Sequence, residues 1–411
     1  MLMAPRRLRR YQALTGVLAL WFCAYVLLAT RVVQTGIYWL SYYAVDYRSG
    51  FVRRGLGGQI IALFPDRLYF PVAYTLTWGS FAAFCLALIV TIRHIIRGNP
   101  KSERRWMISL LIPVLPFSVS FAVLGPRPEL YGASALLVFG VILTRLATHR
   151  ATLAASAVFG ATIAVLAFVH ELIPLEFAVG AVLAVAVLAR PTDAAVRRSC
   201  ILLATAPGLV ATGIITLFGR RDLGPQICAG VPHKMVTNPF QVPSERITDF
   251  FLGRYSSKSD YHDWVCQNIV PYFGAKLSAW LGTVASIGVV PLLAGFIHGL
   301  LVAVVVVWLI GAITGVRFRQ FIAAIRGGIA LPLLALSLMI PVFVTGVDWI
   351  RWWTVILINI AGCYLIFTAS QQAIDKPASA QQRQIFAIAL VLCAFIPISA
   401  GPGYFTKWIT V

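Results

Sequence analysis

The stretch Tyr42–Gln59 concentrates side chains that suit phosphate chemistry. It reads YYAVDYRSGFVRRGLGGQ and contains one carboxylate (Asp46), three arginines (Arg48, Arg53 and Arg54) and four glycines. An aspartate at a membrane edge can act as a general base toward an acceptor hydroxyl. Planar guanidinium groups bind phosphate through paired hydrogen bonds, and glycines allow close backbone approach to an anion. We therefore interpret Asp46 as a candidate base and the three arginines as candidate ligands of a phosphate or pyrophosphate.

Three further positions, each at the end of an apolar segment, place an acid beside a base. They are Arg127 with Glu129, His170 with Glu171, and Asp348 with Arg351. Charge at a membrane boundary is costly and tends to be functional. We interpret His170 and Glu171 as candidates for a second acid or base, and the other two pairs as walls of a substrate cavity. The alternative is that each pair is a salt bridge that fixes helix ends together.

The composition indicates what kind of fold positions these side chains. The chain has 411 residues, of which 59% are hydrophobic and 12% charged, and its mean hydropathy is +0.84. Soluble domains are nearer 45–50% apolar and about 25% charged. Many apolar runs reach the roughly 20 residues that cross a bilayer as a helix. The sequence thus predicts an all-α polytopic membrane protein with about eleven transmembrane helices, within a range of roughly ten to twelve.

The apolar runs give expected spans along one transmembrane domain, residues 1–411. These spans are residues 12–33, 68–92, 106–124, 130–147, 152–169, 174–190, 199–218, 292–314, 327–345, 353–370 and 385–402. Residues 219–274 are polar and are expected to form an extracytoplasmic cap loop. Residues 275–290 are expected to be an interfacial or re-entrant helix, although 275–316 could also cross twice.

The net charge of +20 does not require a nucleic-acid partner. Lys and Arg collect in short cytoplasmic loops of membrane proteins, and the N-terminal segment 1–11 carries four arginines. We expect a multi-pass protein of a bacterial inner membrane with a cytoplasmic N-terminus and with the candidate site outside. The bilayer is then an obligate partner.

The cysteines fit the same topology. Only Cys228 and Cys266 lie in the 219–274 loop, and they are disulfide candidates if that loop faces an oxidising compartment. Cys and His show no metal-ligand spacing anywhere in the chain, so the sequence predicts no metal site. The motifs of ATP hydrolysis, serine hydrolysis and zinc proteolysis are also missing, and no cofactor is expected.

Two motifs, DYRSGFVRRGLGG (46–58) and DWIRW (348–352), resemble a set of bacterial proteins from polysaccharide gene clusters. The multi-span chain, with the acid Asp46 just after its first span, resembles the GT-C membrane glycosyltransferases. The resemblance implies transfer from a polyprenyl-phosphate or polyprenyl-pyrophosphate sugar at the outer face, with Asp46 at the base position. Many GT-C members have paired acids there, whereas Asp46 is flanked by Val45 and Tyr47, so metal dependence is not implied. The late outer loop and the outer arginines also resemble Wzy-type polysaccharide polymerases.

We therefore expect a glycosyltransferase or polysaccharide polymerase of cell-surface polysaccharide assembly, such as O-antigen or exopolysaccharide. Its partners would be a polyprenyl-linked sugar or oligosaccharide and polysaccharide-assembly proteins. A transporter or lipid-linked glycan flippase is the alternative. It would need polar residues at bilayer mid-depth, where this sequence has few, because its charges gather at span ends. A non-catalytic scaffold is a third option.

Overall fold

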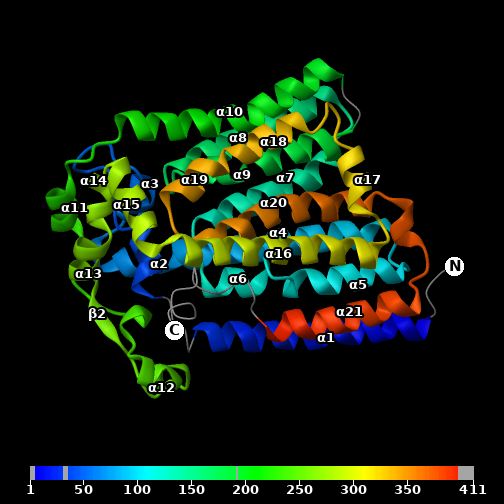
Figure 1. Ribbon diagram of the computed structural model, residues 1–411, viewed down its shortest axis with the longest axis horizontal. Coiled ribbons are helices and arrows are strands. Elements are labelled where there is room, and N and C mark those ends of the chain that lie inside the picture. The colour runs from blue at the N-terminus through cyan, green and yellow to red at the C-terminus, as the bar shows by residue number, and fades with distance from the viewer. Residues whose placement is uncertain (1–4, 31–35, 191–192, 397–411) are drawn as a thin grey trace.

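A computed structural model describes residues 5–30, 36–190 and 193–396. It is an all-α membrane protein, as the composition predicts. In the described part of the chain, the only strands are β1 (Met235–Thr237) and β2 (Lys258–Asp260), which pair antiparallel. Seven helical segments are long and apolar enough to cross a membrane, and several shorter apolar helices accompany them. The long helices run side by side along the longest axis of the molecule (Figure 1).

Each of the eleven expected spans coincides with a helical segment of the bundle. These segments are α1 (Pro5–Leu28), α4 (Tyr69–Gly98), α5 (Glu103–Leu111) with α6 (Val119–Leu124), α7 (Glu129–Leu143), α8 (His149–Ala167), α9 (Ile173–Leu183) continued by a π-helical turn (Ala184–Leu188), α10 (Ala194–Phe218), α16 (Val289–Thr314), α18 (Ala330–Ser337) with α19 (Met339–Thr345), α20 (Trp349–Ala369) and α21 (Ala380–Phe395). The last residues of the expected spans 12–33 and 385–402 lie outside the described residues.

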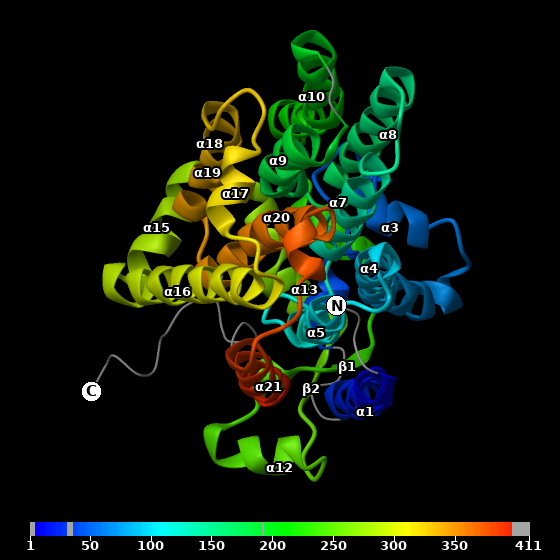
Figure 2. The same ribbon diagram turned by 90° about the vertical axis from the view of Figure 1, so that its right-hand side faces the viewer.

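Helix α20 occupies the centre of the bundle, between α7, α9 and α16 (Figure 2). It is apolar around almost its whole circumference, and most of its side chains are buried. An all-round apolar helix is stable only when surrounded. By contrast, α10 and α16 keep large apolar side chains exposed, such as Val210 and Val304. In a membrane protein such side chains are the ones that meet lipid.

The segment 219–274 gathers at one end of the bundle, here called the cap end (Figure 1). It contains α11 (Gly224–Gly230), the two strands, α12 (Ile247–Phe251), α13 (Tyr261–Asn268) and α14 (Val270–Gly274), with two short 3-10 turns (Pro239–Gln241 and Ser244–Arg246). Two further short helices, α2 (Ile37–Ser41) and α3 (Gly55–Ile61), lie at the same end. A disulfide joins Cys228 of α11 to Cys266 of α13, with 5.5 Å between their Cα atoms.

Helix α15 (Leu277–Ile287) is the segment expected to be interfacial or re-entrant. Its 11 residues span about 16 Å at 1.5 Å per residue, roughly half of a hydrocarbon core. None of its side chains is buried. Gly288, with a φ of 89°, separates it from α16, and this backbone conformation is one that glycine adopts without strain. The chain therefore turns before it enters the long helix.

The opposite end of the bundle, where α1 begins, is tied together by two arginines of α5. Arg105 is buried and donates to Asp375 (2.7 Å), to the Ile95 carbonyl of α4 (2.7 Å) and to the Ala369 carbonyl of α20 (2.9 Å). Arg104 donates to the Ala373 carbonyl at 2.9 Å and to a carbonyl at the end of α16 at 3.3 Å. These bonds satisfy carbonyl groups that helix ends otherwise leave without partners.

Candidate functional site

The main cavity opens at the cap end and has a volume of about 670 Å³. Its wall comes from α2, the Tyr42–Arg54 loop, the α8–α9 turn, the end of α10, the cap, α15, α19 and the start of α20. Five arginines line it against two carboxylates and one histidine: Arg53, Arg54, Arg220, Arg221 and Arg351, with Glu171, Asp348 and His170. The remaining wall is largely apolar and aromatic, and α15 and α19 contribute to it. The cavity is therefore electropositive and partly apolar.

Six of the residues predicted from sequence line this cavity together. They are Arg53, Arg54, His170, Glu171, Asp348 and Arg351. They come from three separate parts of the chain, and the bundle brings them to one place. The other four predicted site residues, Asp46, Arg48, Arg127 and Glu129, do not line it.

Arg54 is held in an uncommon backbone conformation. Its φ of 59° is the only positive value among the described non-glycine residues, and such a conformation costs of order 1 kcal/mol or more. Arg54 immediately precedes α3. The Leu56 amide donates to the Phe168 carbonyl at 3.2 Å, which fixes α3 against the α8–α9 turn. This geometry directs the guanidinium of Arg54 toward Glu171.

The glycines of α3 serve close packing against the chain itself. A Cβ on Gly55 would lie 2.2 Å from the Tyr47 ring, and one on Gly58 would lie 2.1 Å from the Val45 carbonyl oxygen. Their close approach is thus to residues 42–47 and not to an anion. The glycines allow α3 to pack closely against residues 42–47, in the same loop that contains Arg53 and Arg54.

We expect Gly58→Ala to destabilise the protein by about 1–3 kcal/mol, the range for overpacking, because the added methyl meets backbone that cannot rotate away. Thermal unfolding in detergent measures this. The matched control is Gly213→Ala in α10, where a Cβ meets no atom within 4 Å and the substitution should be neutral or slightly stabilising. Equal unfolding temperatures for the two variants would show that the α3 contact is not tight.

Glu171 is the centre of the cationic wall. Arg54 donates to both of its carboxylate oxygens, from Nε at 2.8 Å and from Nη2 at 3.0 Å, and Nη1 of Arg53 lies 3.5 Å from it. Burial works against the charge of Glu171, but Arg54 and Arg53 outweigh it and hold the pKa of that carboxyl well below its usual range. Glu171 is therefore an anion that positions two arginines.

Arg53 has spare binding capacity. Its guanidinium stacks on Phe273 at 4.9 Å and donates to the Tyr272 carbonyl, while its buried Nε has no hydrogen-bond partner among the described residues. Burial lowers the pKa of Arg53 to about 10; Glu171 opposes this effect, and Arg54 and Arg221 add to it. A further anion in the cavity would relieve this excess of positive charge.

His170 is buried beside this cluster, with only 1% of its surface exposed. Its ring lies 5.5 Å from the ring of Tyr42, and its Nδ1 accepts from the Leu172 amide at 3.4 Å. Burial lowers the pKa of His170 to about 4, and Arg54 contributes further to the lowering. At neutral pH the imidazole is therefore neutral.

The predicted pair Asp348 and Arg351 lies at the start of α20 and lines the same cavity as Glu171. Nη1 of Arg351 lies 2.8 Å from Asp348 and donates to the Tyr42 hydroxyl at 3.3 Å. Behind Arg351, Glu129 is 2% exposed, and its nearest ion-pair distance is 3.9 Å to Arg351 Nε. Neither Glu129 oxygen has a hydrogen-bond partner among the described residues.

Arg127 lies away from the cavity wall. Its guanidinium sits over the rings of Trp39 (4.9 Å) and Phe121 (5.1 Å), and its Nε donates to the Gly125 carbonyl. Burial lowers the pKa of Arg127. These contacts fit a residue that packs helices together at the cap end of the bundle.

Asp46 and Arg48 pair with each other outside the cavity wall. Nε of Arg48 donates to Asp46 at 2.7 Å, and the Arg48 amide donates to the same carboxylate at 2.9 Å. The side chain of Asp46 is 16% exposed. In this arrangement the carboxylate predicted as base pairs with Arg48 and does not line the cavity with Arg53 and Arg54.

Two groups of residues at the site were not predicted. Glu176, in the first turn of α9, is fully buried, and neither of its oxygens has a partner in the described chain. An acid inside an apolar run is a visible signal, and Glu176 lies within the expected span 174–190. The aromatic wall, including Tyr38 and Trp280, carries no spacing signal because its members are far apart in sequence.

Fold and site together define an all-α membrane protein with an electropositive cavity at the cap end. The family model of the "Uncharacterised membrane protein Rv1490" family matches residues 11–394, and the chain belongs to this family. It is 41% identical over 401 residues to the uncharacterized protein Rv1490 of Mycobacterium tuberculosis (strain H37Rv) and, equally, to the uncharacterized protein Mb1527 of Mycobacterium bovis. Each alignment covers 97% of this chain and 92% of the relative. No solved structure matches the chain.

Proposed function

We propose that this protein is a membrane glycosyltransferase that takes sugar from a polyprenyl-phosphate or polyprenyl-pyrophosphate donor. The observation that carries the proposal is the charge of the main cavity, where five arginines face two carboxylates. Guanidinium groups bind phosphate in two-pronged geometry. The apolar wall to which α15 and α19 contribute suits the chain of a lipid donor. The resemblance of the 46–58 and 348–352 motifs to proteins of polysaccharide gene clusters points the same way, as does the GT-C-like acid after the first span.

In the proposed reaction an acceptor hydroxyl loses its proton to a carboxylate and attacks the anomeric carbon. The bond between that carbon and the donor phosphate oxygen breaks, and the phosphate leaves with the electron pair. The arginines stabilise the charge that develops on it.

Three carboxylates compete for the role of base. Glu171 is unsuited, because two arginines hold its pKa low. Asp348 lines the cavity with 31% of its side chain exposed, and we assign it the role. Asp46, the choice from the sequence, remains the competing prediction; it would have to leave Arg48 and turn toward the cavity.

The proposed topology places the cap end outside a bacterial inner membrane and the N-terminus in the cytoplasm. Four arginines near the start of α1 follow the positive-inside rule. The disulfide at the cap end suits an oxidising compartment. The proposed partners are a polyprenyl-linked sugar and other proteins of surface-polysaccharide assembly.

The proposal is tested by analysing the surface glycans of cells that lack this protein. These cells are complemented with wild type, Asp348→Asn or Asp46→Asn at equal membrane levels. We expect a lost or shortened surface glycan that wild type restores and Asp348→Asn does not. Rescue by Asp348→Asn but not by Asp46→Asn would move the base to Asp46. Full rescue by both variants, or an unchanged glycan without the protein, would overturn the enzymatic proposal.

A binding experiment tests the proposed phosphate site independently of the proposed reaction. Arg221 lines the cavity and makes no ion pair with a described residue. In nanodiscs, we expect Arg221→Ala to weaken binding of a polyprenyl phosphate about tenfold, or 1.4 kcal/mol, and binding of the neutral polyprenol to be weak for all variants. The control is Arg254→Ala, an exposed arginine of the cap outside the cavity. Equal binding by the two variants would contradict a phosphate site here.

A proton-coupled transporter is the second candidate, and one observation favours it. Glu129 and Glu176 are both buried with unpartnered carboxylates among the described residues, and buried acids within spans often form proton relays. In that case Glu176→Gln would abolish substrate uptake or export while leaving polyprenyl-phosphate binding unchanged.

A further inference from the structure

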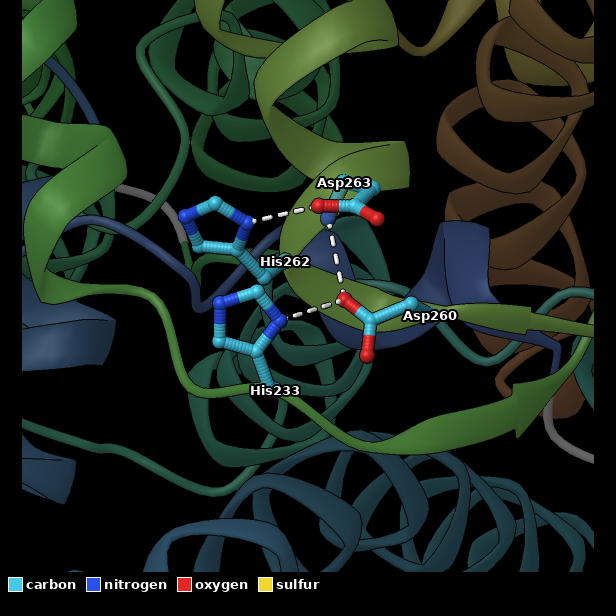
Figure 3. Close-up of side chains that lie close together, drawn as sticks. All are labelled: His233, Asp260, His262 and Asp263. Atoms are coloured by element: carbon cyan, nitrogen blue, oxygen red, sulfur yellow. Dashed lines mark hydrogen bonds and ion pairs between the residues drawn. The ribbon is translucent and has the colours of Figure 1, made fainter.

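A second set of polar side chains lies in the cap, away from the main cavity. His233, Asp260, His262 and Asp263 converge where the β1–β2 hairpin meets α13 (Figure 3). Each offers a nitrogen or a carboxylate oxygen, and these ligand atoms all lie within 4.8 Å of one another. Atoms that coordinate one zinc ion tetrahedrally at about 2.1 Å lie roughly 3.4 Å apart. Small rotations of these four side chains would therefore bring their ligand atoms to the distances of a zinc coordination shell.

The fold specifies this convergence. The antiparallel register pairs Met235 with Asp260, so His233, two residues before Met235, reaches the start of α13. Asp260 caps that helix by accepting from the Asp263 amide at 3.1 Å. His262 and Asp263 then follow in the first turn of the helix. The two paired strands and helix α13 together place all four side chains close to one another.

The existing contacts already pair each imidazole with a carboxylate. Nδ1 of His233 lies 3.1 Å from Asp260, and Nδ1 of His262 lies 2.9 Å from Asp263. The two imidazole rings stack with centroids 4.0 Å apart. Asp260 and His262 are about a quarter exposed, whereas His233 and Asp263 are largely exposed. The site thus has two ligands held by their surroundings, two adjustable ligands and an open path for an ion.

We propose that these four side chains bind a divalent transition-metal ion, with Zn²⁺ as the first choice. Two imidazoles and two carboxylates form a four-ligand set that suits zinc better than calcium or magnesium, which prefer all-oxygen shells. The residues carry no metal-ligand spacing in the sequence, since His233 and Asp260 are 27 residues apart and the strand register brings them together.

The ion has a structural consequence for the cap. Asp260 and Asp263 also line a polar cavity of about 390 Å³, together with the aromatic rings of Phe240 and Trp264. A metal that fixes both carboxylates fixes one wall of that cavity. It also clips the hairpin to α13, the helix that the disulfide joins to α11.

Metal content tests the inference independently of any enzymatic activity. Full-length protein in detergent is stripped with a chelator and titrated with Zn²⁺, followed by calorimetry and elemental analysis. We expect one Zn²⁺ per chain in wild type. His233→Ala combined with His262→Ala should weaken binding by more than about tenfold, because even loss of an outer-shell partner can cost that much. His149→Ala, at an exposed histidine of α8, is the matched control.

A second variant and a second probe guard against misfolding. Asp263→Asn changes a largely exposed ligand without altering its size and should also weaken Zn²⁺ binding. Co²⁺ bound by wild type should give the visible absorption of a four-coordinate site, and the variants should lose it. The inference fails if wild type retains no Zn²⁺ after gel filtration. It also fails if the double variant binds as wild type does.

Discussion

Glu171→Gln should be among the most destabilising single changes at the main cavity. The carboxylate neutralises Arg54 and Arg53, and its loss leaves two partly buried guanidiniums without an anion. Breaking a buried ion pair by removing one partner costs about 3–5 kcal/mol. We expect a value near the lower limit, about 3 kcal/mol, because a quarter of the Arg54 side chain is exposed. Thermal unfolding in detergent gives the measurement.

A double-mutant cycle shows how much of the lost stability comes from the contact between Arg54 and Glu171. Arg54→Gln should destabilise less than Glu171→Gln, because Glu171 then keeps Arg53. The double variant should cost less than the sum of the two single variants, since the groups that replace the pair are uncharged. Additive effects would mean that the Arg54–Glu171 contact contributes little. A polyprenyl phosphate should partly restore the Glu171→Gln protein, because it supplies the missing negative charge.

His170 should make the protein less stable in mild acid. Its folded pKa of about 4 lies below the unfolded value of about 6.5, so the unfolded chain binds the proton more readily. The contribution is complete above about pH 6.5 and is lost as the pH falls toward 4. A pKa difference of about 2.5 corresponds to roughly 3 kcal/mol.

The measurement compares unfolding temperatures of wild type and His170→Asn between pH 7 and pH 4. The variant should lose less stability over this window, because asparagine does not titrate. Other groups contribute equally to both proteins, so the difference between them isolates His170. Parallel curves would show that the imidazole is protonated in the folded protein without penalty.

The sequence was sufficient for the helices and for most of the charged side chains that line the main cavity. Apolar runs locate spans because a bilayer demands long apolar helices, and charges at the ends of those runs mark the level of the cavity. The short α15 could also be expected, because 275–316 is too long for one span and the positive charge after it favours a single crossing. The family description agrees with the fold class at the level of a membrane protein.

The pairing of the charges could not be read from the sequence. Spacing suggests neighbours, such as Asp46 with Arg48, and that pair does form. Arg54, however, meets Glu171, 117 residues away, and Arg351 meets Tyr42, 309 residues away. These partners are chosen by helix packing and by the left-handed backbone of Arg54, and neither leaves a periodic signal. The residues of the proposed metal site in the cap are likewise brought together by strand register and helix start, and no periodic signal in the sequence indicates this.

The hydrogen bonds of Arg104 and Arg105 in α5 limit how far the helices can move apart at the end of the bundle where α1 begins. Arg105 connects α4, α5, α20 and the turn that carries Asp375, and Arg104 adds the end of α16. A protein that opens alternately to both sides of a membrane must separate helices at each end in turn. We infer that helix separation is most restricted at this end of the bundle, so a change that widens the main cavity should move helices at the cap end. For the proposed transferase, donor and acceptor would then enter, and products would leave, at that same end.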